Sequence, residues 1–405
     1  MGSYARIIAG RLLHVEMVFV GLLLRLAVFL SVFPGAYVDG ATREFGDGRP
    51  LPLSACEWHQ GTLLTNTSTG PVESIEDCRF VVRDPEFLDI LGSSPKLVEL
   101  VKTDAHEGGA WYPDKDEFYF SSNKLTSSTG QIKTDLKKVN LRTRNVTNLS
   151  APENNTPNGM VLDNDGNLVV CQQGSLNQGG FIQRINLKTM KNTVVADNWF
   201  GVPFNSPNDA VVKRDGSIWF TDPSYGSVQG FRSTPKVNNQ VYRISNIGVV
   251  DAVADGFTQP NGLAFSHDEK HLYVTDTGFA VGVQGKYDAT KPHSITVFDV
   301  GVDGFLTNRR LFASVGVYDG SYPGLGVPDG IKVDTQERVY VSTVDGVQVF
   351  NQLGKPLGLI RQPSVSNMGF AGRNLDTLYI LNDTTISYVQ LQVRAAGLKY
   401  AGSSH

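Results

Sequence analysis

The sequence predicts an all-β fold, a six-bladed β-propeller, and three observations favour it. A short phrase that opens with an acid or an amide recurs six times, and the steps between first residues are 51, 50, 53, 68 and 38. A strand-like run, a polar turn and a second strand-like run follow each phrase, and the chain is rich in turn formers, with 42 Gly and 19 Pro. A strand-built repeat of about 40–50 residues is typical of a propeller blade. The phrases are Glu107-Gly108, Asn158-Gly159, Asn208-Asp209, Asn261-Gly262, Asp329-Gly330 and Asn367-Met368.

Residues 1–40 differ in kind from the rest of the chain. Arginines precede an apolar stretch over residues 17–33, which Arg25 interrupts, and small residues follow at Gly35 and Ala36. This pattern indicates a secretory signal peptide that is cleaved near residues 36–42. The alternative is a signal-anchor helix, but such a helix needs about 20 uninterrupted apolar residues. We therefore expect a secreted protein without a stable membrane anchor after cleavage.

Residues 41–79 form an N-terminal arm rich in Gly, Ser, Thr and Pro, and the propeller is expected over residues 80–405. Cys56 and Cys78 lie in or beside this arm, where a disulfide would hold it, whereas Cys171 is expected as a buried free thiol. Sequons support the secretory route, and they occur at Asn66, Asn145, Asn148, Asn154 and Asn382.

Propellers close by pairing strands from the two chain ends in one blade, which protects exposed strand edges. We expect the region around residues 80–101 to complete the blade that ends near residue 395. The long step after Asn261 leaves room for an insertion starting at Gly282, which could cover one face of the ring. The net charge is −4 and there is no basic stripe, so the sequence gives no support for nucleic-acid binding. It does not predict an oligomeric state.

The residue that opens each inner strand should face the central channel. Glu107, Asn208, Asn261 and Asp329 together offer two carboxylates and two amide oxygens. This all-oxygen set suits one divalent cation, with Ca²⁺ preferred and Mg²⁺, Mn²⁺ or Zn²⁺ as alternatives. The glycine after most of these residues would allow a close backbone approach near a ligand. Asn-Gly and Asp-Gly are also common turn dipeptides, but a role in turns does not explain Glu107.

A second set of polar residues ends the next strand of several blades. It includes Gln173, Asp222 and Asp276. We expect Asp222 to cap a turn, and Asp276 to cap a turn or serve in catalysis. His106 should face away from the side that Glu107 faces, as neighbours in a strand do. Tyr225, Trp111 and Phe204 are candidate pocket walls, although aromatic residues in propellers usually pack between blades.

Four motifs carry a family resemblance. They are HEGGAWYP from His106, FNSPNDAVVKRDG from Phe204, FTQPNGLAFSHD from Phe257 with LYVTDTG from Leu272, and VPDGIKVD from Val327. They resemble the SMP-30/gluconolactonase/luciferin-regenerating family, with the greatest similarity to fungal lactonohydrolases, from about Leu97 to the end of the chain. The resemblance implies a six-bladed propeller that holds one divalent cation and hydrolyses sugar and related lactones.

By motif, the family's metal ligands fall on Glu107, Asn208, Asn261 and Asp329, and Asn158 fits a substrate-side role. One departure is Gln173, since many relatives carry a glutamate in this stretch. This change would leave metal binding intact but alter proton transfer or substrate choice.

The predicted function is a secreted, metal-dependent lactone hydrolase acting on a small molecule. Asp329 is the candidate general base and Asp276 the second. Asn158, Asn208, Gln173 and Tyr225 are candidate substrate-binding residues. The alternative is a family propeller that catalyses hetero-Diels–Alder cyclisation in fungal specialised metabolism, because a shaped pocket can orient reactants without hydrolysis. A non-catalytic binding propeller is disfavoured, because it would be expected to lose the carboxylates Glu107 and Asp329.

Overall fold

The computed structural model describes residues 49, 51–52, 54–59, 62–65, 78–127, 130–149, 155–281, 286–316 and 326–396. The predicted signal peptide, the sequons Asn66 and Asn154, and the start of the predicted insertion lie outside the described residues. Within the described ranges, no helix is long and apolar enough to cross a membrane.

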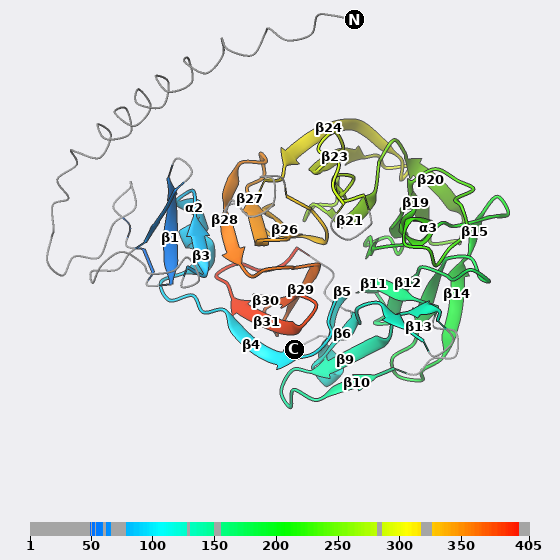
Figure 1. Ribbon diagram of the computed structural model, residues 1–405, viewed down its shortest axis with the longest axis horizontal. Coiled ribbons are helices and arrows are strands. Elements are labelled where there is room, and N and C mark those ends of the chain that lie inside the picture. The colour runs from blue at the N-terminus through cyan, green and yellow to red at the C-terminus, as the bar shows by residue number, and fades with distance from the viewer. Residues whose placement is uncertain are drawn as a thin grey trace, which may run out of the picture. The chain divides into compact units, whose positions relative to one another are not determined.

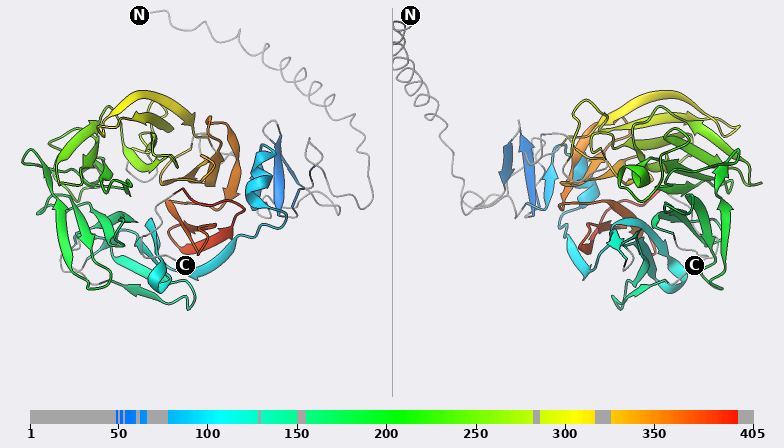
Figure 2. Two further views of the ribbon diagram at one scale, coloured as in Figure 1. Left: turned by 180° about the vertical axis from the view of Figure 1, so that it is seen from behind. Right: turned by 45° about the vertical axis from the view of Figure 1, so that its right-hand side comes forward.

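Six antiparallel sheets surround a central axis, which confirms the six-bladed propeller (Figure 1; Figure 2, left). The inner two strands of the six blades are, in order, β5 (Glu107–Tyr112) and β6 (Glu117–Ser121), β11 (Pro157–Leu162) and β12 (Leu168–Gln172), β17 (Ala210–Val212) and β18 (Ile218–Asp222), β21 (Pro260–Phe265) and β22 (His271–Asp276), β25 (Ile331–Val333) and β26 (Val339–Thr343), and β29 (Asn367–Ala371) and β30 (Thr377–Leu381). In blades one to four the first strand along the chain lies innermost, and in blades five and six the innermost strands are β25 and β29.

The outer two strands complete each blade, and their side chains pack against the neighbouring blade. They are β9 (Leu136–Asn140) and β10 (Val146–Asn148), β13 (Phe181–Ile185) and β14 (Asn192–Ala196), β19 (Gln240–Ile244) and β20 (Val250–Ala254), β23 (Ser294–Val300) and β24 (Leu306–Ser314), β27 (Gly346–Phe350) and β28 (Pro356–Arg361), and β31 (Thr385–Gln390) and β4 (Val98–Lys102). Two short hairpins, β7 (Leu125–Thr126) with β8 (Ile132–Lys133) and β15 (Asn198–Trp199) with β16 (Val202–Pro203), lie outside the blades.

The ring closes as the sequence predicts, by pairing strands from the two ends of the chain in the last blade. Of the two N-terminal strands expected there, only the second joins that blade. β4 pairs antiparallel with β31 as the outer strand of blade six, for example Lys102 with Thr385. β3 (Phe80–Val82) pairs instead with β28 of blade five. The expectation that all of residues 80–101 complete the last blade is therefore wrong for β3. The helix α2 (Glu86–Leu91) lies between β3 and β4 in the sequence and separates the two destinations.

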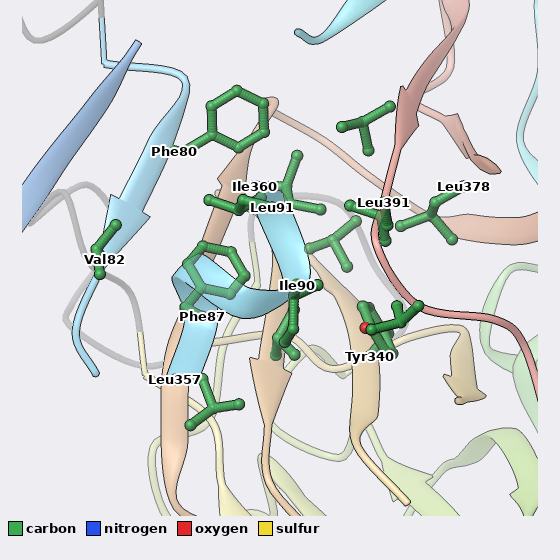
Figure 3. Close-up of a cluster of buried hydrophobic side chains, with 14 of the residues drawn as sticks. Phe80, Val82, Phe87, Ile90, Leu91, Tyr340, Leu357, Ile360, Leu378 and Leu391 are labelled. Atoms are coloured by element: carbon green, nitrogen blue, oxygen red, sulfur yellow. The ribbon is translucent and has the colours of Figure 1, made fainter. Parts of the chain in front are cut away.

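The N-terminal segment extends blade five into a seven-stranded sheet, in the order β2-β1-β3-β28-β27-β26-β25. β1 (Ala55–His59) pairs parallel with β3 and antiparallel with β2 (Thr62–Thr65). Helix α2 buries its apolar face in one cluster with blades five and six (Figure 3). A disulfide joins Cys56 in β1 to Cys78 just before β3, as predicted. Cys171 is a buried free thiol, also as predicted.

The described helices are short: α2, α3 (Tyr225–Val228) and one 3₁₀ turn at Pro113–Lys115. The second strand of most blades is buried along its whole length, as in Ile218–Asp222 and Val339–Thr343. Apolar side chains on both faces of such a strand pack against both neighbouring blades. This arrangement explains the near-continuous apolar runs that mark these strands in the sequence.

Candidate functional site

The start of each inner strand is fixed by hydrogen bonds from the preceding blade. In three consecutive blade pairs, a hydroxyl from the second strand of one blade donates to a backbone carbonyl at the start of the next blade's inner strand. The bonds run from Thr221 Oγ1 to Asn261 O (2.6 Å), from Thr275 Oγ1 to Asp329 O (2.7 Å) and from Ser342 Oγ to Ser366 O (2.6 Å). Because these bonds hold the backbone, the side chains of the recurring phrase are placed without needing bonds of their own.

The glycines of the phrase allow neighbouring blades to approach closely. A Cβ atom at Gly159 would lie 2.5 Å from the Asn208 carbonyl, and one at Gly262 would lie 2.5 Å from the Asp329 carbonyl. The N–H groups of both glycines donate to those same carbonyls, at 2.8 and 3.2 Å. The close approach predicted at these glycines is therefore made by the next blade's backbone.

Three of the four predicted metal ligands carry buried oxygens that lack partners within the described residues. Glu107, Asn208 and Asn261 are 3%, 3% and 4% exposed, and Asp329 is partly exposed. The Oδ1 atoms of Asn208, Asn261 and Asp329 are buried and have no hydrogen-bond partner within the described part of the chain. Leaving a buried polar atom unpaired costs about 1–3 kcal/mol, so three such oxygens call for a ligand that the protein does not supply. The donor set therefore fits a hard divalent cation.

This set contains only two carboxylates, and its other members are amides. Among the described residues, no three His, Cys, Asp or Glu side chains form a metal-binding group. Any cation bound at this ring would thus depend on the amide oxygens of Asn208 and Asn261.

The electrostatics of the ring are those of crowded carboxylates. Burial and the nearby Asp329 raise the pKa of Glu107 well above its usual value. Burial, followed by the charges of Asp209 and Asp383, raises the pKa of Asp329 to about 8, although Lys124 opposes this shift. Burial also raises the pKa of Asp209. Without a cation, these groups therefore favour their neutral forms, and a cation would favour the charged forms.

The predicted substrate-side residues lie around this ring. The Asn158 amide nitrogen donates to the backbone carbonyl of Asn208 at 3.0 Å. The Asn261 amide nitrogen donates to the Tyr225 hydroxyl at 3.2 Å, which brings those two residues together. Gln173 is 1% exposed, and its Oε1 atom has no partner among the residues that the structure describes. Gln173 thus offers a free acceptor where many relatives carry an acid.

Asp222 and Asp276 hold the loops that precede their blades' inner strands. The Asp222 carboxylate accepts from the backbone N–H groups of Asn205 and Ser206, at 2.8 and 2.7 Å, so it caps a turn as expected. Asp276 accepts from Thr258, Gln259 and Gly278, at 2.9, 2.9 and 3.1 Å. Both carboxylate oxygens of Asp276 are thereby committed to backbone donors. This geometry favours the capping role for Asp276 over proton transfer.

Two of the three candidate pocket walls pack in clusters between blades, Phe204 between blades two and three and Trp111 between blades one and six. Phe204 is fully buried against Phe220 and Tyr242, with ring centroids 5.0 and 5.1 Å away. The Trp111 indole N–H donates to Asp116 in its own blade, at 3.0 Å. Of the three, only Tyr225 contacts a residue of the predicted ring.

Sequence reasoning missed a cluster beside Glu107. His106 Nδ1 lies 2.6 Å from Asp383 Oδ1 and 3.0 Å from Ser366 Oγ. Both neighbours contact the same ring nitrogen, so this is not the arrangement of a Ser-His-Asp triad, in which serine and aspartate contact opposite nitrogens. Asp383 lies between β30 and β31 of blade six and Ser366 lies directly before β29, and they are 277 and 260 residues from His106 in the sequence. No local pattern could have joined them.

The family comparison and the curated relatives agree with this geometry. The sequence model described as SMP-30/Gluconolactonase/LRE-like region matches residues 176–384. The chain is 34% identical over 229 residues to a gluconolactonase of Zymomonas mobilis, covering 55% of this chain and 60% of that protein. This chain thus spans less than two thirds of that relative. It is 27% identical over 356 residues to lactonohydrolase oryL of Aspergillus oryzae, covering 81% of this chain and 78% of that protein.

A solved structure extends the likeness to three dimensions. A gluconolactonase from Xanthomonas campestris superposes with a TM-score of 0.62 at 29% identity, covering 77% of this chain and 95% of that chain. The resemblance drawn from the four motifs is confirmed.

Proposed function

Because this chain belongs to the SMP-30/gluconolactonase/LRE-like family, we propose that it is a divalent-metal-dependent lactone hydrolase. The named relatives are lactonases and gluconolactonases, which supports a lactonase-like hydrolase. The observation that carries the proposal is the set of unpartnered, buried Oδ1 atoms of Asn208, Asn261 and Asp329, taken among the described residues, beside the buried carboxylate of Glu107.

Glu107, Asn208, Asn261 and Asp329 would hold the cation. Two carboxylates and two amide oxygens favour Ca²⁺ over the softer or more geometrically demanding alternatives Mg²⁺, Mn²⁺ and Zn²⁺. When bound, such an ion polarises a carbonyl and lowers the pKa of water.

Asp329 is the residue that takes the proton from the attacking water. A general base must have an oxygen within reach of the proton that it takes. Asp329 Oδ1 is free of protein donors within the described residues, so this oxygen can accept that proton. Asp276 lacks this freedom, since backbone N–H groups use both of its oxygens.

The amides and Tyr225 orient the substrate. Asn158 spends one N–H on the Asn208 carbonyl and keeps a second N–H for a substrate oxygen. Gln173 presents an acceptor for a substrate hydroxyl, where an acid would also carry a proton. The substrate is accordingly a small lactone of the sugar type or of a specialised-metabolite pathway.

The proposed place of action is outside the cell or in the secretory pathway. The Cys56–Cys78 disulfide supports an oxidising compartment. Asn145 and Asn148 are exposed sequon residues that an oligosaccharide could reach, whereas Asn382 accepts three local hydrogen bonds within a turn.

The test is hydrolysis of aldono-γ- and δ-lactones, followed in a pH-stat by proton release. Protein stripped with a chelator should be inactive, and Ca²⁺ should restore activity. Protein that opens none of these lactones with Ca²⁺, Mg²⁺, Mn²⁺ or Zn²⁺ would contradict the proposal and direct attention to cyclisation.

A further inference from the structure

Four of the six residues that open the recurring phrases form the proposed cation ring. Asn367 is one of the two that this ring leaves unused, and Asn158 is the other. Asn367 begins β29 in blade six and is fully buried. Its amide nitrogen donates to Glu107 Oε2 at 2.8 Å. Its amide oxygen accepts from the ammonium of Lys332 at 3.2 Å and from the backbone N–H of Met368 at 2.8 Å.

The orientation of this amide decides whether it helps or harms Glu107. With the nitrogen toward Glu107, the amide stabilises the charged carboxylate; with the oxygen there, it would repel that charge. Lys332 has no acceptor to offer, so its ammonium selects the orientation in which the Asn367 oxygen faces it. The lysine, together with the Met368 backbone N–H, thereby directs the amide N–H toward the carboxylate.

A glycine makes room for this arrangement. A Cβ atom at Gly330 would lie 2.3 Å from the Asn367 Oδ1 atom and 2.5 Å from its Cγ. Gly330 also stands two residues before Lys332 in the same strand region of blade five. Blade five therefore supplies both the space for the Asn367 side chain and the cation that orients it.

We propose that Asn367 and Lys332 are positioning residues that fix the Glu107 carboxylate for the cation. The inference rests on the proposed role of Glu107 as a metal ligand. Outer hydrogen-bond partners of metal ligands typically change metal affinity by about 10–100-fold when mutated. Asn367 and Lys332 reach the ligand through a chain of two side-chain hydrogen bonds across three blades.

The test measures Ca²⁺ affinity by titration calorimetry on folded protein. Asn367→Leu removes both amide donors at similar volume and should weaken binding at least about tenfold. Gln348→Leu is the matched control, since Gln348 is a buried amide of blade five that bonds Gly316 and Asp345 instead of the ring. The control should bind Ca²⁺ as the wild type does.

Lys332→Met separates positioning from simple charge. Loss of a positive charge near the site would by itself strengthen cation binding, because it removes a repulsion. Weaker binding must come through a group that the ammonium holds, either the Asn367 amide or the charged form of Asp209, and we expect it to be about tenfold weaker. In the Asn367→Leu background the same change should not weaken binding further. Unchanged or tighter binding in Lys332→Met, or affinity within twofold of wild type in Asn367→Leu, would overturn the proposal.

Failure of the underlying metal site gives a different result. If the wild type binds none of the four divalent ions, the proposed function loses its cation. The positioning pair is then judged on metal-free protein, by urea unfolding of Asn367→Leu, Glu107→Gln and the double variant. Effects that combine less than additively support the contact as a determinant of Glu107 placement, and additive effects overturn it.

Discussion

Asp329 and Asp276 are neighbouring aspartates with opposite surroundings. They lie in adjacent blades, and Thr275, next to Asp276, donates to the Asp329 backbone carbonyl. Asp276 accepts three backbone N–H bonds through both oxygens, whereas Asp329 keeps a buried oxygen without a partner among the described residues. A carboxylate in this fold is available for chemistry when a neighbouring blade holds its backbone and the loops of its own blade leave a side-chain oxygen unpaired. Residue type alone does not separate the two.

The largest expected effect comes from Asp329→Asn. If Asp329 accepts the proton in the reaction, kcat should fall about 10²–10⁴-fold, the usual contribution of a general base. Asp276→Asn should keep most of its activity at a temperature where it remains folded. Steady-state kinetics on one lactone at saturating Ca²⁺ measure both. Equal losses in the two variants would erase the distinction between them.

The second effect is a pH dependence produced by buried carboxylates with raised pKa values, among them the capped Asp222, whose pKa burial raises to about 7. The pKa of Asp329 is raised from 3.8 to about 8, so the folded metal-free protein binds its proton more tightly than the unfolded chain does. The contribution of Asp329 to the unfolding free energy is then fully present below about pH 4 and is lost as the pH rises toward 8. Glu107 and Asp209, whose pKa values are also raised, add to this loss. The exposed carboxylates with lowered pKa, such as Asp268 at about 2, act below this window.

Urea denaturation in a chelator across pH 4–8 measures this slope. Saturating Ca²⁺ should remove the part of the slope that Glu107 and Asp329 produce, because an ion holds those carboxylates charged in the folded state, and the part from Asp222 should remain. Asp329→Asn should flatten the slope in metal-free protein. A stability that rises through this range would mean that the buried carboxylates are paired in the folded protein.

The third effect reverses sign between the two aspartates. Asp276→Asn places an amide N–H against backbone N–H groups and should lower the unfolding free energy by about 1–3 kcal/mol. Asp329→Asn removes a buried charge that has no protein donor at Oδ1 in the described structure, and should leave metal-free protein as stable or more stable. Thermal unfolding in a chelator at pH 8 compares the two variants. Destabilisation of both would show that Asp329 is also a structural group.

The sequence predicted the propeller and the inner strands well, because both follow from local patterns. The phrase lies at or just before each inner strand. Asn367 is the first residue of β29, and β25 starts at Ile331, two residues after Asp329. The destination of β3 was not predictable, since a short apolar strand can join either neighbouring blade edge and the choice depends on helix α2.

The surroundings of the candidate site were harder to predict than its ring. His106 contacts Asp383, and Glu107 contacts Asn367, each from 260 residues or more away. Asp276 remained a candidate active-site acid in the sequence, whereas Asp222 was correctly expected to cap a turn, and the backbone N–H groups before the inner strands that they cap lie 16–18 residues before them. Capping across a blade leaves no fixed short spacing, unlike a helix cap.

The smallest expected effect tests how Asp329 is placed. Thr275 Oγ1 donates to the Asp329 carbonyl at 2.7 Å, and Thr275 is fully buried. Thr275→Val keeps the shape and removes only this donor, so it should cost about 1 kcal/mol of unfolding free energy. Because this backbone bond places Asp329, Ca²⁺ affinity should also fall a few-fold. Calorimetry on folded protein measures that affinity. Thr193→Val is the control, since Thr193 is exposed on the outer strand β14 and its hydroxyl meets only a backbone carbonyl of the same blade. Lower stability with unchanged Ca²⁺ affinity in Thr275→Val would mean that Asp329 is held by its side-chain surroundings, and the contrast with Asp276 would then rest on the unpartnered oxygen alone.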